Sequence, residues 1–599
     1  MPKTTANPAP VHYEVAAANL QAHLFQVTLT IAQPQAQQTV SLPVWIPGSY
    51  LVREFAKNLQ NLQARQGKRL VPLHQGDKHS WVAQCREDAP LVLTYEVCAY
   101  DNSVRTAWLD TARGFFNGTS LCLRVHGQEA ARHSLRITAT PATAAWSVAT
   151  GLAPLKTDKK GFGLYGADHY DELVDCPVEM GDFWQGRFTA CGVAHRFVVA
   201  GAAPSFDGER LLADTQKICE TAIRFWHGKG KAPFGSYLFM LNAVHDGYGG
   251  LEHRNSTALI CGRRDLPRLG DKRQSDGYTT LLGLISHEYF HTWNVKRLRP
   301  AEFATYDYDQ ENYTQLLWFF EGFTSYYDDL LLRRAGLIDD ATYLRLITKT
   351  INQVLQTPGR KVQTVAQASF DAWVKYYRQD ENTPNATVSY YTKGSLVALC
   401  LDLKLRQEGK TTLDDVMRGL WSRCKAGPMA EADLLAVLEQ LAGRPYVRDL
   451  QQWVHSTGEL PLAELLAAHG VTVKSEPAQL AQRLGLRVAE NHSVQIKTVL
   501  RGGAAEKAGL APGDEWLGVQ VKGQGWRISK LDDVGFYAGS QKQLTAVVAR
   551  DGRLLELPLQ LPGTQPTPAK GRSRPATPDN VGLTCTDAAA TSRWLAGAA

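Results

Sequence analysis

Several features that would place this chain in other protein classes are missing from its sequence. The ten cysteines are scattered without a C-x-x-C pair, so neither a disulfide framework nor a cysteine-ligated zinc is expected. No uninterrupted apolar run approaches the ~20 residues that span a bilayer, and residues 1–10 lack the basic and apolar segments of a signal peptide. These absences predict a cytoplasmic protein with no membrane partner.

Charge of one sign is also scarce. A formal net charge of +6 over 599 residues is mild, which argues against nucleic acid or an anionic membrane as the main partner. The same length is enough for about four domains, each with its own core. The composition therefore favours a multidomain globular protein.

Hydrophobic periodicity changes along the chain and divides it into four parts. Residues 1–185 predict an N-terminal antiparallel β-sandwich, because runs such as 23–30 and 91–97 alternate with period two. Residues 186–468 are mostly helical in pattern, residues 469–562 return to short strands, and residues 563–599 are rich in Pro, Thr, Ala, Gly and Ser. We expect a multidomain α+β protein whose last segment is a mobile tail.

The segment His287-Glu288-Tyr289-Phe290-His291 reads as H-E-x-x-H within a predicted helix over 279–293. Histidines four residues apart share one face of a helix, so both imidazoles can bind one metal ion. Glu288 then lies where it can reach a metal-activated water without ligating the metal. This pattern is typical of a zinc peptidase, with two nitrogen ligands and a general base on one element.

A third ligand is expected from a second predicted helix, over 313–335. Glu321 stands within the aromatic run Leu317 to Phe323, where a buried carboxylate would be costly unless it were paired or bound to a metal. Other carboxylates and histidines lack that setting: His245, His253, Asp307, Asp309 and Glu311. We therefore predict a His₂Glu site that holds one Zn²⁺ per chain.

Longer stretches of the sequence resemble a known family. H-E-x-x-H followed by W-F-F-E-G-F is similar to the gluzincin peptidases, and residues 287–300 resemble the glycyl aminopeptidase family, peptidase family M61. Residues 43–50, 104–108 and 114–119 are also similar to that family, and the resemblance ends near residue 563. It implies a thermolysin-like catalytic domain and a preference for small N-terminal residues, glycine and alanine.

The resemblance also implies a site for the substrate's free amine. Gly249-Gly250-Leu251-Glu252-His253 stands where related aminopeptidases carry a glycine-x-Met-Glu-Asn strand. Gly249 and Gly250 would let a strand edge approach a bound peptide closely, and Glu252 would pair with the α-ammonium. His253 departs from the related pattern, which has Asn, and leaves open how the first peptide carbonyl is held.

A tyrosine completes the predicted catalytic set. The Y-x-K-G pattern at Tyr391 resembles the tyrosine site of related aminopeptidases, where a phenol stabilises the oxyanion. A donor aimed at developing charge is physically sensible. Tyr390 is the neighbour with which it could be confused, and both tyrosines could instead be core residues. Asn294 and Thr324 are within sequence reach of the histidines as hydrogen-bond partners, but neither is assigned.

The segment Gly503 to Glu515 resembles a PDZ-like signature, a short helix ended by glycine and followed by a proline-glycine turn. Such a domain binds extended peptides or C-termini, and Leu484-Gly485-Leu486 could form its carboxylate loop. The alternative, a domain that only packs against the catalytic body, stays open.

The leading hypothesis is a zinc aminopeptidase that acts on peptides with a free N-terminus. Glu288 would activate water and pass its proton to the leaving amine, while Glu252 holds the substrate's amine and Tyr391 the oxyanion. The alternatives are a zinc metalloendopeptidase and a peptide-binding scaffold with an inactive peptidase domain.

Overall fold

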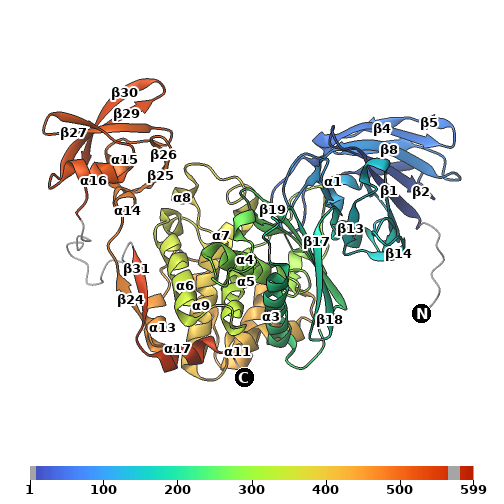
Figure 1. Cartoon of the computed structure of the whole chain (residues 1–599). Helices are drawn as coiled ribbons and strands as arrows, with labels where there is room; N and C mark the ends of the chain where they lie inside the picture. The colour runs from blue at the N-terminus through green and yellow to red at the C-terminus, as the bar shows by residue number, and fades with distance from the viewer. Residues whose placement is uncertain (1–8, 564–579, 598–599) are drawn as a thin grey trace. The chain divides into compact units, whose positions relative to one another are not determined.

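The computed structural model describes residues 9–563 and 580–597 (Figure 1). The chain divides into two compact units. The first comprises residues 1–313, 335–337 and 424–429, and the second comprises residues 314–334, 338–423 and 430–599. In the described residues, no helix is both long enough and apolar enough to cross a membrane.

The N-terminal part of the first unit is built on an eight-stranded sheet. Its strands alternate buried and exposed positions, as Val11, Tyr13 and Val15 of β1 show, so one face supplies the core. The strand order is β14-β15-β12-β1-β2-β8-β4-β5. The bounds are β1 Val11–Asn19, β2 Leu24–Ile31, β4 Leu59–Gln66, β5 Arg69–Val71, β8 Leu91–Cys98, β12 His133–Thr138, β14 Ala153–Thr157 and β15 Gly163–Ala167.

The predicted antiparallel arrangement is wrong for one strand pair. β1 and β12 run parallel, with Val11 opposite His133 and Ala16 opposite Thr138. Parallel pairing is open to them because the long segment between them provides the crossover that such neighbours need. Local alternation reports burial but not strand direction, so the sequence could not distinguish the two. The N-terminal domain is β-rich, as expected.

Two four-stranded sheets accompany the large sheet, in the orders β13-β16-β10-β9 and β11-β3-β7-β6. Their strands are β3 Gln37–Ser41, β6 Leu73–Gln75, β7 Ser80–Gln84, β9 Ala107–Leu109, β10 Arg113–Phe116, β11 Arg124–Val125, β13 Ser147–Thr150 and β16 Val178–Gly181. Two short helices, α1 (Gly118–Leu121) and α2 (Tyr170–Val174), carry buried residues of the same core.

A five-stranded sheet in the order β17-β18-β19-β21-β20 follows within the first unit. Its strands are β17 Trp184–Ala190, β18 Val193–Ala200, β19 Ser236–Val244, β20 Tyr248–Glu252 and β21 Ser256–Gly262. β20 is the last strand and pairs antiparallel with β21. Helices α3 (Gly208–His227) and α4 (Asp276–Phe290) belong to this part, as does the small pair β22 (Arg299–Pro300) and β23 (Pro428–Met429).

The second unit begins with helices, which bear out the helical pattern of the sequence. Helices α5 and α9 pack closely because two glycines meet: a Cβ built on Gly322 would lie 2.6 Å from the Cα of Gly394. The bounds are α5 Leu317–Arg334, α6 Asp340–Leu355, α7 Val365–Phe370, α8 Thr383–Ala386, α9 Tyr390–Glu408, α10 Leu413–Arg423, α11 Glu431–Ala442, α12 Val447–Trp453 and α13 Leu462–Ala468.

A second β-rich part lies within 480–560. Its sheet has the order β25-β26-β27-β29-β30, with β28 beside β27. The strands are β25 Leu486–Glu490, β26 Val494–Val499, β27 Glu515–Val521, β28 Gln524–Arg527, β29 Gln543–Arg550 and β30 Arg553–Gln560. Helices α14 (Leu480–Leu484), α15 (Ala504–Lys507) and α16 (Asp532–Ala538) complete it, around a core that includes Trp516.

The segment predicted as a mobile tail differs from that prediction over residues 580–597. β31 (Val581–Cys585) pairs with β24 (Val471–Ser475), and α17 (Ala588–Leu595) buries Trp594 and Leu595. Asn352 fixes the strand by hydrogen bonds to both backbone groups of Val581. A composition rich in small residues hid two large apolar anchors. Residues 564–579 and 598–599 lie outside the described part of the chain.

Candidate metal centre and active site

Helix α4 carries the two histidines. Ser275 caps its first turn by accepting a hydrogen bond from the N–H of Tyr278. His291 directly follows the last residue of the helix, and its own φ of −59° and ψ of −19° are still helical. The i, i+4 geometry therefore holds, and the Nε2 atoms of His287 and His291 lie 3.0 Å apart. Both nitrogens are directed at the same point, as the sequence spacing predicts.

The tautomer of His291 is set by a backbone carbonyl. Its Nδ1 lies 2.7 Å from the carbonyl oxygen of Asn294, which can only accept, so Nδ1 carries the proton. A neutral His291 then presents the lone pair of Nε2, the form that binds a metal. Asn294 thus contributes through its main chain, while the Thr324 hydroxyl donates to the carbonyl of Phe320 within its own helix.

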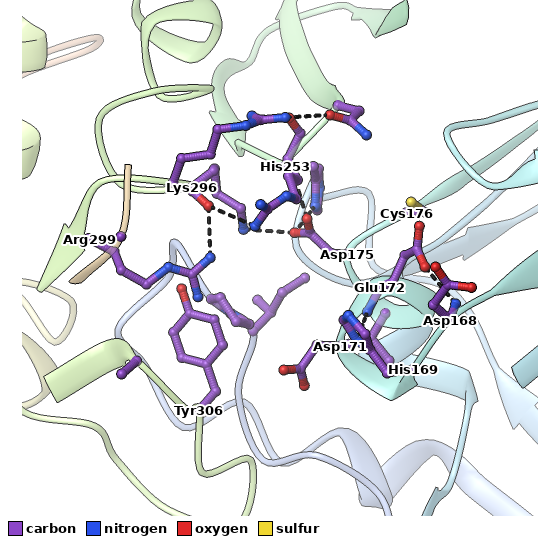
Figure 2. A pocket seen from close by; sticks show the side chains of 18 of the residues that line it. Asp168, His169, Asp171, Glu172, Asp175, Cys176, His253, Lys296, Arg299 and Tyr306 are labelled. Atoms are coloured by element: carbon purple, nitrogen blue, oxygen red, sulfur yellow. Dashed lines mark hydrogen bonds and ion pairs between the residues drawn. The ribbon is translucent and has the colours of Figure 1, made fainter. Parts of the chain in front are cut away.

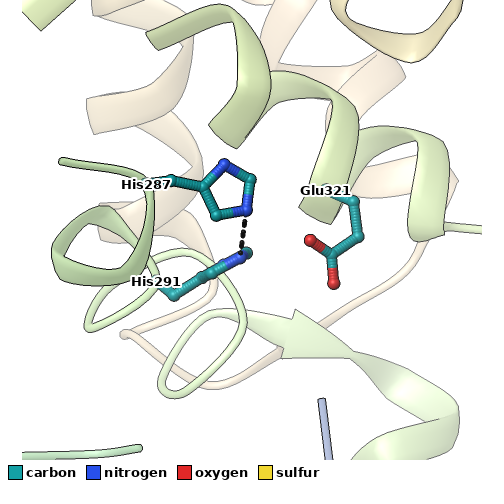
Figure 3. Close-up of side chains that lie close together, drawn as sticks. All are labelled: His287, His291 and Glu321. Carbon is teal, nitrogen blue, oxygen red and sulfur yellow. Dashed lines mark hydrogen bonds between the residues drawn. The ribbon is translucent and has the colours of Figure 1, made fainter. Parts of the chain in front are cut away.

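Glu321 of α5 joins the two histidines (Figure 3). One ligand atom from each of the three residues lies within 4.8 Å of the other two. Glu321 is 2% exposed, and its carboxylate faces the imidazoles. Two imidazole nitrogens and one carboxylate match the donor set of Zn²⁺, so the residues present fit that ion. The competing ligands are absent from this group, which is the one such cluster in the described residues.

The carboxylate of Glu288 lies directly against strand β20. A Cβ built on Gly250 would lie 2.2 Å from Oε1 of Glu288, so only glycine leaves room for this side chain. Glu288 is buried, at 4% exposure. The predicted base and the predicted glycine strand therefore meet in space, although 38 residues of sequence separate them.

Glu252, at the end of the same strand, is also buried and also lies against a glycine. A Cβ on Gly48 would lie 2.6 Å from Oε2 of Glu252, and the φ angle of Gly48 is +94°, a value that favours glycine. The proline-rich loop of residues 43–50 thus passes close to the carboxylate proposed for the substrate's amine. β20 therefore carries Glu252 and contacts Glu288 at positions two residues apart.

His253 points to Asp175 rather than standing alone. Its Nδ1 lies 3.2 Å from Asp175 Oδ1, and Lys296 Nζ lies 2.7 Å from the same oxygen (Figure 2). The backbone N–H of Arg254 donates to the other oxygen. Asp175, which directly follows α2, therefore connects that segment to the end of β20 and to the loop after α4. The sequence carried no signal for Asp175, because no recognisable motif surrounds it.

Charge in this cluster is balanced by the close pairing. Burial by itself would raise the pKa of Asp175, but the ammonium of Lys296 and the imidazole of His253 hold it well below its ordinary value. Burial would lower the pKa of Lys296, but Asp175 above all, followed by Tyr306 and Glu252, raises it. Both groups are therefore charged at neutral pH, and Lys296 places positive charge near Glu252.

A cavity of about 520 Å³ opens beside this cluster (Figure 2). Its walls include Asp175, His253, Lys296, Arg254 and Arg299, so it is lined by charges of both signs. Neither Glu252, Glu288 nor the two histidines line it. The cavity adjoins the residues that support the candidate active site but is not the place where the metal ligands meet.

Tyr391 lies in the first turn of α9, where Ser389 caps the helix. Burial, followed by the nearby carboxylate of Glu321, raises the pKa of Tyr391 well above its ordinary value. The phenol is therefore a protonated donor near the metal ligand at physiological pH. Tyr390 is fully buried and stacks on it, with ring centroids 4.7 Å apart. Tyr377, which no sequence motif marks, places its hydroxyl 3.4 Å from that of Tyr391.

The protein is a zinc metallopeptidase, and the cluster of His287, His291 and Glu321 is suited to hold that ion. Family models match two parts of the chain: the M61 glycyl aminopeptidase model matches residues 280–397, and the peptidase M61 N-terminal domain matches residues 12–182. The chain belongs to the M61 glycyl aminopeptidase family. The expected family is confirmed.

A solved structure shares the fold over almost the whole chain, and two others are less similar. An aminopeptidase N family protein from Idiomarina loihiensis is 36% identical, with a TM-score of 0.91 over 98% of this chain and 100% of that chain. The M1 zinc metallopeptidase from Deinococcus radiodurans is 16% identical, with a TM-score of 0.49 over 76% and 95%. A mutant of that enzyme bound to Tyr-Ser-Ala substrate reaches 0.46 at 15% identity over 76% and 96%. No curated protein matches the sequence.

Proposed function

We propose that this chain is an aminopeptidase that releases N-terminal residues, with glycine and alanine preferred, from peptides. The observation that carries the proposal is the shared strand: β20 bears Glu252 and, two residues earlier, contacts the carboxylate of Glu288. A carboxylate that pairs with a free α-ammonium would then stand two strand residues, about 7 Å, from the residue that contacts the base, so only a peptide bond next to the N-terminus reaches it. The preference for small residues rests on family membership alone.

His287, His291 and Glu321 would hold one Zn²⁺ per chain. The ion, when bound, polarises the substrate carbonyl and lowers the pKa of water. The cluster of the two Nε2 atoms and the buried carboxylate of Glu321 supports this proposal. The N–H of His291 that faces the Asn294 carbonyl keeps the ring in the binding orientation.

The remaining steps belong to side chains of this chain. Glu288 accepts a proton from the attacking water and passes it to the leaving amine, as a general base and then a general acid. Tyr391, protonated because its pKa is raised, donates a hydrogen bond to the oxyanion that forms at the carbonyl. Glu252 binds the α-ammonium and so selects an unblocked N-terminus.

We also propose the domain assignments that the sequence suggested: an N-terminal domain over 1–185, a thermolysin-like catalytic domain over 186–468 and a PDZ-like domain over 469–562. Gly485 has a φ of +74° and directly precedes β25, an edge strand of its sheet, which suits a loop that binds a carboxylate. Peptide C-termini are the proposed ligands of that domain.

The test compares hydrolysis of alanine p-nitroanilide with that of its N-acetylated form, each with and without a chelator. An aminopeptidase hydrolyses only the free amine and loses activity on chelation. Equal hydrolysis of both substrates would refute the proposal and favour a metalloendopeptidase.

A variant of the proposed base tests the alternative, a peptide-binding scaffold with an inactive peptidase domain. Glu288→Gln should abolish hydrolysis while zinc content stays near one per chain, because a base is removed but no ligand. The matched control is Glu439→Gln, which changes an exposed glutamate on α11 and should leave hydrolysis unchanged. A wild-type protein that binds zinc and peptide without hydrolysis would support the scaffold.

A further inference from the structure

One family-like segment of the sequence has no part in the chemistry proposed above: the turn of residues 103–106, before β9. Asn117, fully buried, donates through its side-chain amide to the carbonyls of Val104 and Thr106, at 2.9 and 3.1 Å. The Thr106 hydroxyl donates to the carbonyl of Asp101, and the N–H of Arg105 donates to the Ser103 hydroxyl. The turn is therefore held rigidly, and it presents the side chain of Arg105.

Arg105 reaches the strand on which the proposed active site is built. Its Nη2 donates to the carbonyl of Gly250, at 3.2 Å, and its Nη1 would lie 3.6 Å from a Cβ on Gly249. β20 is the last strand of its sheet in the described part of the chain. The guanidinium thus lies beside the strand at the residue that contacts Glu288.

This guanidinium has no acidic partner among the described residues, and its Nε is buried without a hydrogen bond. Other arginines of the same unit are paired: Arg113 contacts Glu179 at 2.7 Å, and Arg124 contacts Asp309 at 2.9 Å. A partly buried cation with donors to spare is suited to a carboxylate, which it can bind through two parallel N–H groups.

The direction of β20 shows which end of a substrate would meet Arg105. If Glu252 holds the amine and Glu288 acts at the first peptide bond, then Gly250 and Gly249 lie beside the second residue of the substrate, which is the leaving amino acid. Two strand residues span about 7 Å, which is also about the length of one extended dipeptide. Glu252 and Arg105 therefore stand about one dipeptide apart.

We infer that Arg105 binds the free C-terminal carboxylate of the leaving amino acid, so that short peptides, and dipeptides above all, are the favoured substrate class. This inference rests on the proposed function, because it takes the amine site at Glu252 as given. A peptide whose second residue ends in an amide, or continues as a longer chain, offers no carboxylate at that position.

The test measures kcat/KM for Ala-Ala and for Ala-Ala-amide in the wild type and in Arg105→Gln. The wild type should favour the free acid by about tenfold or more, the contribution of a hydrogen bond to a charged group. Arg105→Gln should bring the ratio near one, because the ratio compares two substrates in the same variant and cancels any change that affects both equally. An unchanged ratio would overturn the inference.

Arg263→Gln is the matched control, since Arg263 also donates to backbone carbonyls of this part, those of Gly201 and Ala243, neither of which belongs to β20. Its acid-to-amide ratio should equal that of the wild type. Arg105→Lys, which keeps the charge but loses the paired donors, should give an intermediate ratio and serves if the glutamine variant fails to fold.

Calorimetric binding of the same two dipeptides to Glu288→Gln, with and without Arg105→Gln, separates this inference from the proposed function. Tighter binding of the acid that disappears with Arg105→Gln supports the carboxylate site even if the wild type hydrolyses neither dipeptide, in which case the proposed function alone falls. Equal binding of acid and amide to Glu288→Gln overturns the inference, whatever the turnover.

Discussion

Replacing Gly250 by alanine tests whether Glu288 must lie against β20. The added Cβ would stand 2.2 Å from Oε1, 2.4 Å from Cδ and 2.6 Å from Cγ of Glu288. Carbon and oxygen atoms normally approach to about 3.5 Å, so the carboxylate must retreat by more than about 1 Å. The change therefore moves the proposed base and leaves every proposed metal ligand untouched.

The expected loss of activity is much larger than the expected loss of stability. A displacement of about 1 Å in a reacting group costs roughly 100-fold, and loss of a general base costs about 100-fold to 10,000-fold. We expect kcat to fall within that range. The free energy of unfolding should fall by only about 1–3 kcal/mol, because the group in contact is the end of a flexible side chain.

The assay measures kcat and KM for alanine p-nitroanilide together with zinc content and thermal unfolding. Gly235→Ala is the control, because a Cβ there has no heavy atom within 4 Å. Combining Gly250→Ala with Glu288→Gln should cost little more than Glu288→Gln alone, since both remove the same function. A Gly250→Ala enzyme with kcat within about threefold of wild type would refute the reasoning.

Three further predictions concern the residues that support the site. Asp175→Asn should lower the free energy of unfolding by about 3–5 kcal/mol at neutral pH, because it leaves the Lys296 ammonium buried without its carboxylate. Because the pKa of Asp175 is lowered in the folded protein, this stability is present above about pH 4 and is lost as the pH falls toward the folded value. The denaturation curves of the wild type and the variant should therefore converge in acid. The double variant Asp175→Asn/Lys296→Met should recover part of the lost stability, and losses that simply add would contradict the pairing. Tyr391→Phe should lower kcat by about 100-fold or more with little change in KM. Because the pKa of Tyr391 is raised, wild-type activity should show no loss from phenol ionisation up to about pH 10. An equal kcat in both proteins would remove Tyr391 from the mechanism. Gly322→Ala should lower the free energy of unfolding by about 1–3 kcal/mol or more, because the added Cβ meets the backbone of Gly394 between α5 and α9. It should also weaken zinc binding in a chelator competition. An unchanged free energy of unfolding and zinc affinity would show that the two helices can separate freely.

The proposed metal ligands could be predicted from the sequence because their arrangement depends on local periodicity. His287 and His291 are one helical repeat apart, and Glu321 stood out as a carboxylate within an aromatic helix. Glu252 and Tyr391 were named by family resemblance, and the structure places Glu252 on β20 and Tyr391 near Glu321. Their catalytic roles remain proposals.

Other features had no local signal. The parallel pairing of β1 with β12 joins strands with the same alternation as an antiparallel pair. The end of the chain was expected to be mobile because its composition is poor in large apolar residues, yet Trp594 and Leu595 anchor α17. The role of Asp175 depends on Lys296, which is 121 residues away in the chain.

The sequence by itself determined the chemical identity of the site: two imidazoles on one helical face, a carboxylate beside them, and a second helix able to supply a third ligand. Only the tertiary structure decided what surrounds them, namely that Gly250 makes room for Glu288, that Asp175 holds the end of β20, and that Arg105 lies on the strand edge. The reason is physical: residues within one helical turn are placed by the backbone's own repeat, whereas residues far apart in the chain meet only through the packing of the whole fold.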